Sequence, residues 1–91
     1  MSGSSALPRV FAAVQFGDPT HVAGLSIDKG TSFRNGVFPR ANAALLQQYP
    51  LQSYCDFNDV FCDSGLSTAV HLSYVAKYTT AAANFVVSKV A

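Results

Sequence analysis

Charged residues are scarce in this 91-residue chain: they make up 12% of it, and the net charge is +1. No basic cluster is present to neutralise phosphates, which argues against nucleic-acid binding. No apolar run approaches the roughly 20 residues that a membrane-spanning helix needs. Because 49% of the residues are hydrophobic, the composition predicts a packed core, in one small domain or part of a larger one.

The N-terminus also lacks the features of a secretory signal peptide. Residues 1–9 are small and polar rather than basic and then hydrophobic. Two interpretations follow: the protein is cytosolic, or Met1 is not the natural start of the precursor.

Cysteines are few as well, and the two that occur, Cys55 and Cys62, are separated by six residues. Zinc ligands usually have two to four intervening residues and redox pairs have two, so a local disulfide fits the spacing better. A disulfide implies an oxidising compartment. That conflicts with the missing signal peptide and favours a truncated N-terminus.

Two segments have the pattern of β-strands. Residues 10–16 form a continuous apolar run that Gly17-Asp18-Pro19 stops, which predicts a strand buried on both faces in a mostly parallel sheet. Residues 51–55 are a shorter strand candidate. The flanking strands that such a buried strand needs are absent from the chain, so the sheet is expected to be incomplete.

The remaining segments are a long loop and two helices. Residues 20–42 are expected to form a loop with room for short extended pieces, and residues 41–48 a short helix that Pro50 ends. Residues 75–90 carry an apolar stripe at helical spacing. A cap at Thr79 or Thr80 would instead start this helix near residue 79. The stripe consists of Val75, Tyr78, Ala82, Phe85, Val86 and Lys89.

This order of strand, long loop, strand, loop and helix fits the tail of an α/β fold. The sequence contains no internal repeat and no interdomain linker. Residues 1–91 are therefore expected to form a single partial domain.

An acid and a histidine stand in an order that hydrolases use. Asp59 lies between the cysteines and His71 follows twelve residues later, as the acid and the base follow the nucleophile in α/β-hydrolases. From spacing alone, Asp59 as a turn former and His71 as a surface or capping residue stay open. Asp56 and Asp63, each beside a cysteine, compete for the role of acid.

The other histidine, His21, follows Gly-Asp-Pro-Thr and is expected to be a loop residue rather than a base. A metal site built from His21, His71 and the cysteines is the weakest alternative. The ligand spacing is wrong for zinc, and the cysteines have a better use in a disulfide.

Several segments, taken together and in order, resemble the fungal cutinases and acetylxylan esterases, which are serine esterases of the α/β-hydrolase class. The resemblance runs from about Leu7 to Val90. It is carried by the strand and turn Ala12-Ala13-Val14-Gln15-Phe16-Gly17-Asp18-Pro19, the loop from Tyr54 to Cys62, the segment His71-Leu72-Ser73-Tyr74, the tail Ala81-Ala82-Ala83-Asn84-Phe85-Val86, and the arginine-bearing loop Gly36-Val37-Phe38-Pro39-Arg40.

The resemblance implies the C-terminal portion of a three-layer α/β sandwich. It makes Asp59 the triad acid, His71 the general base, and Cys55–Cys62 a disulfide. It further implies a secreted carboxylic ester hydrolase that acts on cutin-like polyester or acetylated xylan, with no cofactor and no metal. Leu66 and Val70, just before the histidine, weakly favour an acyl chain near the base.

The chain departs from the family in one respect that bears on activity. It contains no Gly-x-Ser-x-Gly; the nearest strings, at Gly24 and Gly30, lack the second glycine. In the family the serine precedes the first strand seen here, and the oxyanion donors and a second cysteine pair are missing with it. We therefore expect a fragment that is inactive alone, with the N-terminal half of the domain as its partner. A non-catalytic interaction module or a decayed remnant is the alternative.

Overall fold

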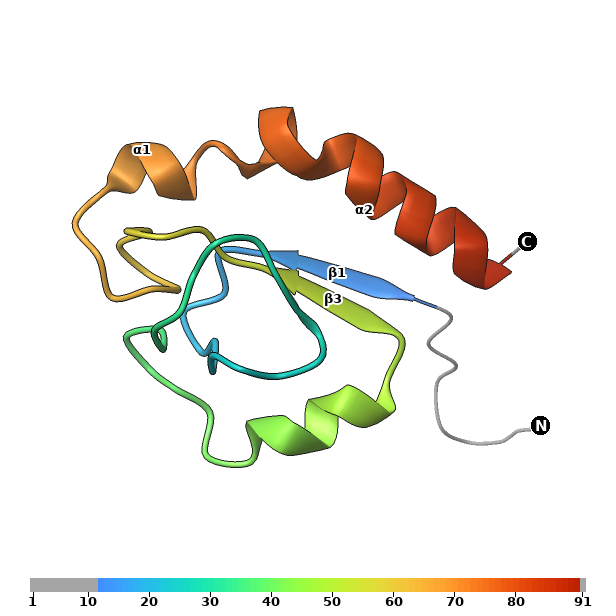
Figure 1. Ribbon diagram of the computed structural model, residues 1–91, viewed down its shortest axis with the longest axis horizontal. Helices are drawn as coiled ribbons and strands as arrows, with labels where there is room; N and C mark the ends of the chain where they lie inside the picture. Colours follow the sequence, from blue (N-terminus) through green and yellow to red (C-terminus); the bar gives the residue numbers. More distant parts are fainter. Residues whose placement is uncertain (1–11, 91) are drawn as a thin grey trace.

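The computed structural model describes residues 12–90, without the side chain of Val90. Three parallel strands form one small sheet in the order β1-β3-β2, and a long C-terminal helix runs along its β1 side (Figure 1). The elements in chain order are β1 (Ala13–Phe16), β2 (Asp28–Lys29), the 3-10 helix η1 (Ala43–Gln48), β3 (Leu51–Tyr54), α1 (Thr68–His71) and α2 (Tyr74–Val90). Within residues 12–90, no helix is long and apolar enough to span a bilayer.

The register of the sheet brings the ends of β1 and β3 together. Ala13 pairs with Leu51 and Phe16 with Tyr54, in parallel. The carboxyl ends of parallel strands lie at one edge of a sheet, where α/β proteins build their sites. The loops that leave this edge are therefore the place to look for function.

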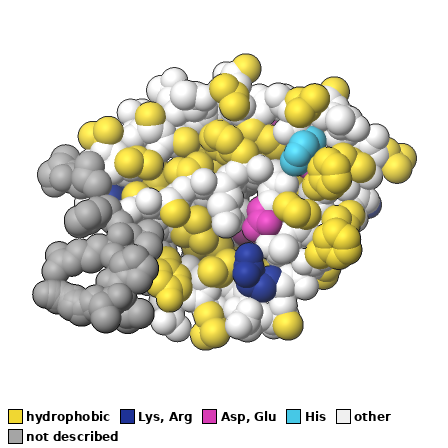
Figure 2. Space-filling view, turned by 180° about the vertical axis from the view of Figure 1, so that it is seen from behind, with side chains coloured by type: hydrophobic (Ala, Val, Ile, Leu, Met, Phe, Trp, Pro, Cys, Tyr) yellow, Lys and Arg dark blue, Asp and Glu magenta, His cyan; other side chains and the backbone are white. Residues whose placement is uncertain are grey.

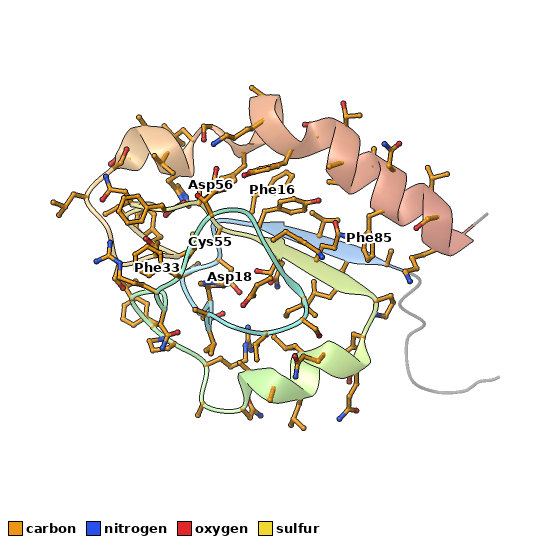
Figure 3. All side chains as sticks on the ribbon, viewed as in Figure 1. Phe16, Asp18, Phe33, Cys55, Asp56 and Phe85 are labelled. Atoms are coloured by element: carbon orange, nitrogen blue, oxygen red, sulfur yellow. A yellow bond between two sulfur atoms is a disulfide. The ribbon has the colours of Figure 1, made fainter. Side chains whose placement is uncertain are left out.

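Aromatic side chains fill the space between the sheet and α2. Phe16 packs edge-on against Tyr54, with ring centroids 5.5 Å apart, and stacks on Tyr74 at 5.9 Å. Figure 3 shows Phe16 and Phe85 in the layer between the strands and the helix. The disulfide and Ala82 complete this core, so α2 packs against both β1 and the disulfide loop.

The strand predictions are partly confirmed. The predicted strand at residues 51–55 is observed as β3, and the long loop contains the two-residue strand β2. The start predicted for the first strand, at Val10, lies outside the described residues. Burial on both faces was wrong, because Ala13–Phe16 are all half-buried: among the described strands β1 has only β3 as a neighbour.

The helix predictions are also confirmed in outline and corrected in detail. The short helix is present but is a 3-10 helix. The long helix begins at Tyr74, so a start near residue 79 was wrong, and Thr79 instead bonds the carbonyl of Val75 within the helix. Three members of the predicted stripe are not buried: Val75 is 69% exposed, and Val86 and Lys89 are exposed as well. The stripe begins at Tyr74, which contacts the disulfide loop.

Candidate active site

The disulfide loop carries the acid, and its path depends on two residues with special backbone requirements, Asn58 and Gly65. Cys55 and Cys62 are bonded, with Cα atoms 6.0 Å apart, and both are fully buried. Asn58 turns the chain in the left-handed region, with φ of 73°, which Asn tolerates better than most residues. A Cβ at Gly65 would lie 2.3 Å from the Asn58 carbonyl oxygen, so only glycine fits there.

Asp59 is completely buried, and hydrogen-bond donors meet both of its carboxylate oxygens. The backbone N–H groups of Phe61 and Cys62 donate to Oδ1 over 2.7 and 3.1 Å. The hydroxyl of Tyr74, on α2, donates to Oδ2 over 2.6 Å. A carboxylate without water needs such partners, and these fix the orientation of Asp59.

His71 lies at the end of the one-turn helix α1, which the sequence did not predict. Ser67 caps this helix by accepting a hydrogen bond from Val70 N over 3.0 Å. The Nδ1 atom of His71 is 3.2 Å from Asp59 Oδ1 and 3.1 Å from Oδ2. Phe61 packs edge-on against the imidazole at 4.6 Å. With Nδ1 on the acid and the side chain 26% exposed, Nε2 is the nitrogen that can take a proton from a substrate or nucleophile.

Gly17, which directly follows β1, lies against both Asp59 and His71. Its φ is +68°, and a Cβ there would lie 2.6 Å from His71 Nδ1 and 3.3 Å from Asp59 Oδ2. Its N–H donates to Tyr54 O over 2.9 Å and ties it to β3. The close approach of this backbone to the acid and the histidine requires glycine.

Asp56, one alternative acid, is committed to other partners. It accepts hydrogen bonds from Lys77 Nζ over 2.7 Å, Tyr78 OH over 2.5 Å and Thr31 N over 3.2 Å. Burial raises the pKa of Asp56, but the bonds from Lys77, Tyr78 and Thr31 outweigh it and hold the pKa below its ordinary value. Asp56 therefore serves as a buried anchor between the disulfide loop and α2.

Asp63, the second alternative, belongs to a separate polar cluster with His21. Ser32 Oγ donates to Asp63 Oδ1 over 2.5 Å, and Arg34 N donates to the same oxygen over 3.0 Å. Burial raises the pKa of Asp63, yet Ser32 and the backbone donors lower it overall. His21 is buried between Asp28 at 3.4 Å and Ser32 at 3.4 Å. Because the Ser32 proton goes to Asp63, this cluster has no free hydroxyl for His21 to activate.

The metal alternative finds no support in the geometry. Both cysteine sulfurs are bonded to each other, and the histidines lie in separate hydrogen-bonded groups. Within residues 12–90, no group of three or more His, Cys, Asp or Glu side chains could hold a metal ion.

Sequence reasoning missed the supporting residues of this site. Tyr74 had a signal, since it is the last residue of the segment His71-Leu72-Ser73-Tyr74, which carries part of the family resemblance. Gly17 also stood in a noted turn, but its approach to His71 is a tertiary contact that no local pattern reports.

Comparison with known proteins identifies the family. The family profile described as Cutinase matches residues 3–90. Acetylxylan esterase 2 of Talaromyces purpureogenus is 39% identical over 87 residues, which are 94% of this chain and 37% of that protein. Cutinase 11 of Verticillium dahliae is 37% identical over 87 residues, covering 94% of this chain and 30% of that protein.

Solved structures agree. The catalytic core domain of acetyl xylan esterase from Trichoderma reesei superimposes with a TM-score of 0.75 at 31% identity, covering 86% of this chain and 38% of that one. An acetylxylan esterase solved at 0.90 Å gives a TM-score of 0.78 at 36% identity, covering 90% and 40%. The chain thus spans less than half the length of each relative, and its sheet and C-terminal helix are a partial α/β fold. The chain belongs to the cutinase family.

Proposed function

We propose that this chain supplies the acid and the base of a serine carboxylic ester hydrolase, with Asp59 as the acid and His71 as the base. The observation that carries the proposal is the contact between His71 Nδ1 and the buried, fully bonded Asp59 carboxylate. An acid in this place keeps the proton on Nδ1 and stabilises the imidazolium that forms when Nε2 takes a proton. The pair lies at the carboxyl edge of a parallel sheet, a common site of catalysis in α/β folds.

The nucleophile comes from a part of the domain outside these 91 residues. The chain has no Gly-x-Ser-x-Gly elbow, and its relatives are more than twice as long. An open apolar hollow of about 290 Å³ lies between β1 and α2, in the place where a neighbouring element of a larger sheet would pack. The hollow is lined by Val14, Phe16, Thr79, Ala82, Ala83 and Val86.

The isolated chain does not hydrolyse esters on this proposal. Without the serine of a Gly-x-Ser-x-Gly elbow, His71 has no nucleophilic hydroxyl to deprotonate, and without an oxyanion hole the tetrahedral intermediate has no donors for its negative charge. A non-catalytic module of the same family is the alternative, and the experiment below separates the two.

The substrate is a carboxylic ester of a plant polymer, either cutin-like polyester or acetylated xylan, as the names of the relatives indicate. Leu66 is 92% exposed and Leu72 is 74% exposed, on either side of His71 in the chain, which favours an apolar group of the substrate near the base. The disulfide supports secretion into an oxidising environment.

Two assays test the proposal. The oxidised chain alone is expected to show no fluorophosphonate labelling and no turnover of p-nitrophenyl butyrate. A chimera in which these residues replace the aligned segment of the Talaromyces acetylxylan esterase is expected to be active. In it, Asp59→Asn lowers kcat about 10⁴-fold, as loss of a triad acid does, and His71→Ala is at least as damaging.

His21→Gln is the matched control, because His21 lies outside the Asp59–His71 pair; this variant is expected to keep its turnover. A folded chimera that is inactive would favour the non-catalytic alternative. Labelling of a serine in the chain alone would show that the nucleophile lies within these residues.

A further inference from the structure

Two tyrosines of α2 each bond a different buried carboxylate of the disulfide loop. Tyr74 and Tyr78 are four residues apart and therefore share one face of the helix. Tyr74 donates to Asp59 Oδ2 over 2.6 Å, and Tyr78 donates to Asp56 Oδ1 over 2.5 Å. The two side chains are chemically identical, but only the first meets the carboxylate that contacts His71.

The hydroxyl of Tyr74 is fully engaged. Its proton goes to Asp59, and its oxygen accepts a hydrogen bond from Asp56 N over 2.9 Å. The nearby Cys62 sulfur, at 3.3 Å, is in the disulfide and has no proton to offer. Burial, and then the bond to Asp59, raises the pKa of Tyr74, so the hydroxyl keeps its proton and stays a donor.

The Asp59 carboxylate accepts hydrogen bonds of different lengths from Tyr74, Phe61 and His71. The shortest bonds are those from Tyr74 OH at 2.6 Å and Phe61 N at 2.7 Å, one to each oxygen. The contacts of His71 Nδ1, at 3.1 and 3.2 Å, are longer and split between both oxygens. The histidine therefore competes with two better-placed donors for the same carboxylate.

We propose that Tyr74 is a positioning residue for the acid–base pair: its hydroxyl fixes the rotation of the Asp59 carboxylate and limits the share of its charge that reaches His71. The role of the pair rests on the function proposed above, but the contact itself does not. A base that must both take and release a proton benefits from an acid whose hold on it is limited.

The test uses nuclear magnetic resonance on the purified chain and follows the proton on His71 Nδ1, assigned by its loss in His71→Gln. Tyr74→Phe keeps the buried ring and removes only the hydroxyl. Oδ2 is then left to His71, so the bond shortens and the proton resonance moves downfield. Tyr78→Phe is the matched control and leaves the resonance in place. Each variant also removes one hydrogen bond to Asp56, from its N–H to Tyr74 or to its Oδ1 from Tyr78, while the ion pair of Asp56 with Lys77 stays in both.

A second variant keeps the hydroxyl and so guards against a failure to fold. Site-specific 3-fluorotyrosine at position 74 is a stronger donor, and it is expected to move the resonance upfield. An unchanged resonance in Tyr74→Phe, an upfield move or loss of the signal, or an equal shift in Tyr78→Phe would each overturn the proposal. None of these readouts needs turnover, so an inactive chimera and a failed role for Tyr74 are distinct results.

Discussion

At the scale of single residues, the site depends on a glycine beneath the acid and the histidine. We expect Gly17→Ala to displace His71 from Asp59, because the added Cβ would lie 2.6 Å from Nδ1. The left-handed conformation adds a cost of about 1–2 kcal/mol in the free energy of unfolding. Urea unfolding and the His71 Nδ1 proton resonance measure the two effects.

Gly24→Ala is the control for strain alone. Gly24 has a φ of +86°, but a Cβ there would meet nothing within 4 Å. This variant is expected to lose about the same 1–2 kcal/mol from its backbone conformation and to leave the His71 resonance unchanged. If both variants behave alike, the close approach of Gly17 to the pair does not constrain the site.

Asp56 predicts how the chain responds to acid. Its pKa in the folded chain lies below the ordinary value, so its bonds stabilise the fold above the unfolded-state pKa of about 3.9. That stability is lost as the pH falls through the lower, folded-state pKa. Asp56→Asn is therefore expected to be less stable at neutral pH and to lose less on acidification, measured by urea unfolding across a pH series. An acid response identical to that of the unmodified chain would contradict this.

The sequence pattern predicted the acid and the base more readily than it predicted the residues that position them. The position of Asp59 between two cysteines, and of His71 twelve residues on, could be found in the sequence. The pattern left Asp56 and Asp63 open as acids. In the structure Asp56 is bonded to Lys77 and Asp63 to Ser32. Ser32 is 31 residues from Asp63 in the chain, so no local sequence pattern could have revealed these bonds.

At the scale of elements, the disulfide loop positions Asp59 for its contact with His71. By the chain-entropy relation, closing a loop of this length stabilises the fold by about 2–3 kcal/mol. We expect the double variant Cys55→Ser/Cys62→Ser to lose about that amount and to weaken the His71–Asp59 contact, because Cys62 N donates to Asp59 Oδ1.

Denaturant unfolding with and without a reductant checks this prediction. The reductant should lower the unfolding midpoint of the natural chain and leave that of the double variant unchanged. Equal midpoints for the oxidised and reduced natural chain would show that hydrogen bonds, rather than the disulfide, hold the loop.

The helices and strands also show which features the sequence patterns could not predict. The helix at residues 75–90 was predictable from its periodicity, but its start was not: Tyr74 begins it and bonds Asp59 and the backbone of Asp56. These tertiary bonds outweigh the capping preference of Thr79 and Thr80. Likewise the apolar run of β1 indicated a buried strand, whereas burial depends on neighbours, and the described sheet places only β3 beside it.

At the scale of the whole molecule, apolar surface is the dominant feature. Hydrophobic side chains spread widely over the face seen in Figure 2, and the hollow between β1 and α2 adds to them. Surfaces of this kind usually mark contact sites, and a strand with a free edge invites pairing.

We expect the isolated chain to self-associate through the hollow as its concentration rises, measured as an increase in mass by analytical ultracentrifugation. Val86→Lys places a charge in the hollow and is expected to shift the chain toward the monomer. Val75→Lys is the matched control, because Val75 is 69% exposed near the other end of α2 and does not line the hollow. Equal association of both variants would place the contact elsewhere. A monomer at every concentration would show that the hollow does not drive self-association. The remaining candidate occupant would then be a complementary part of the domain outside this chain.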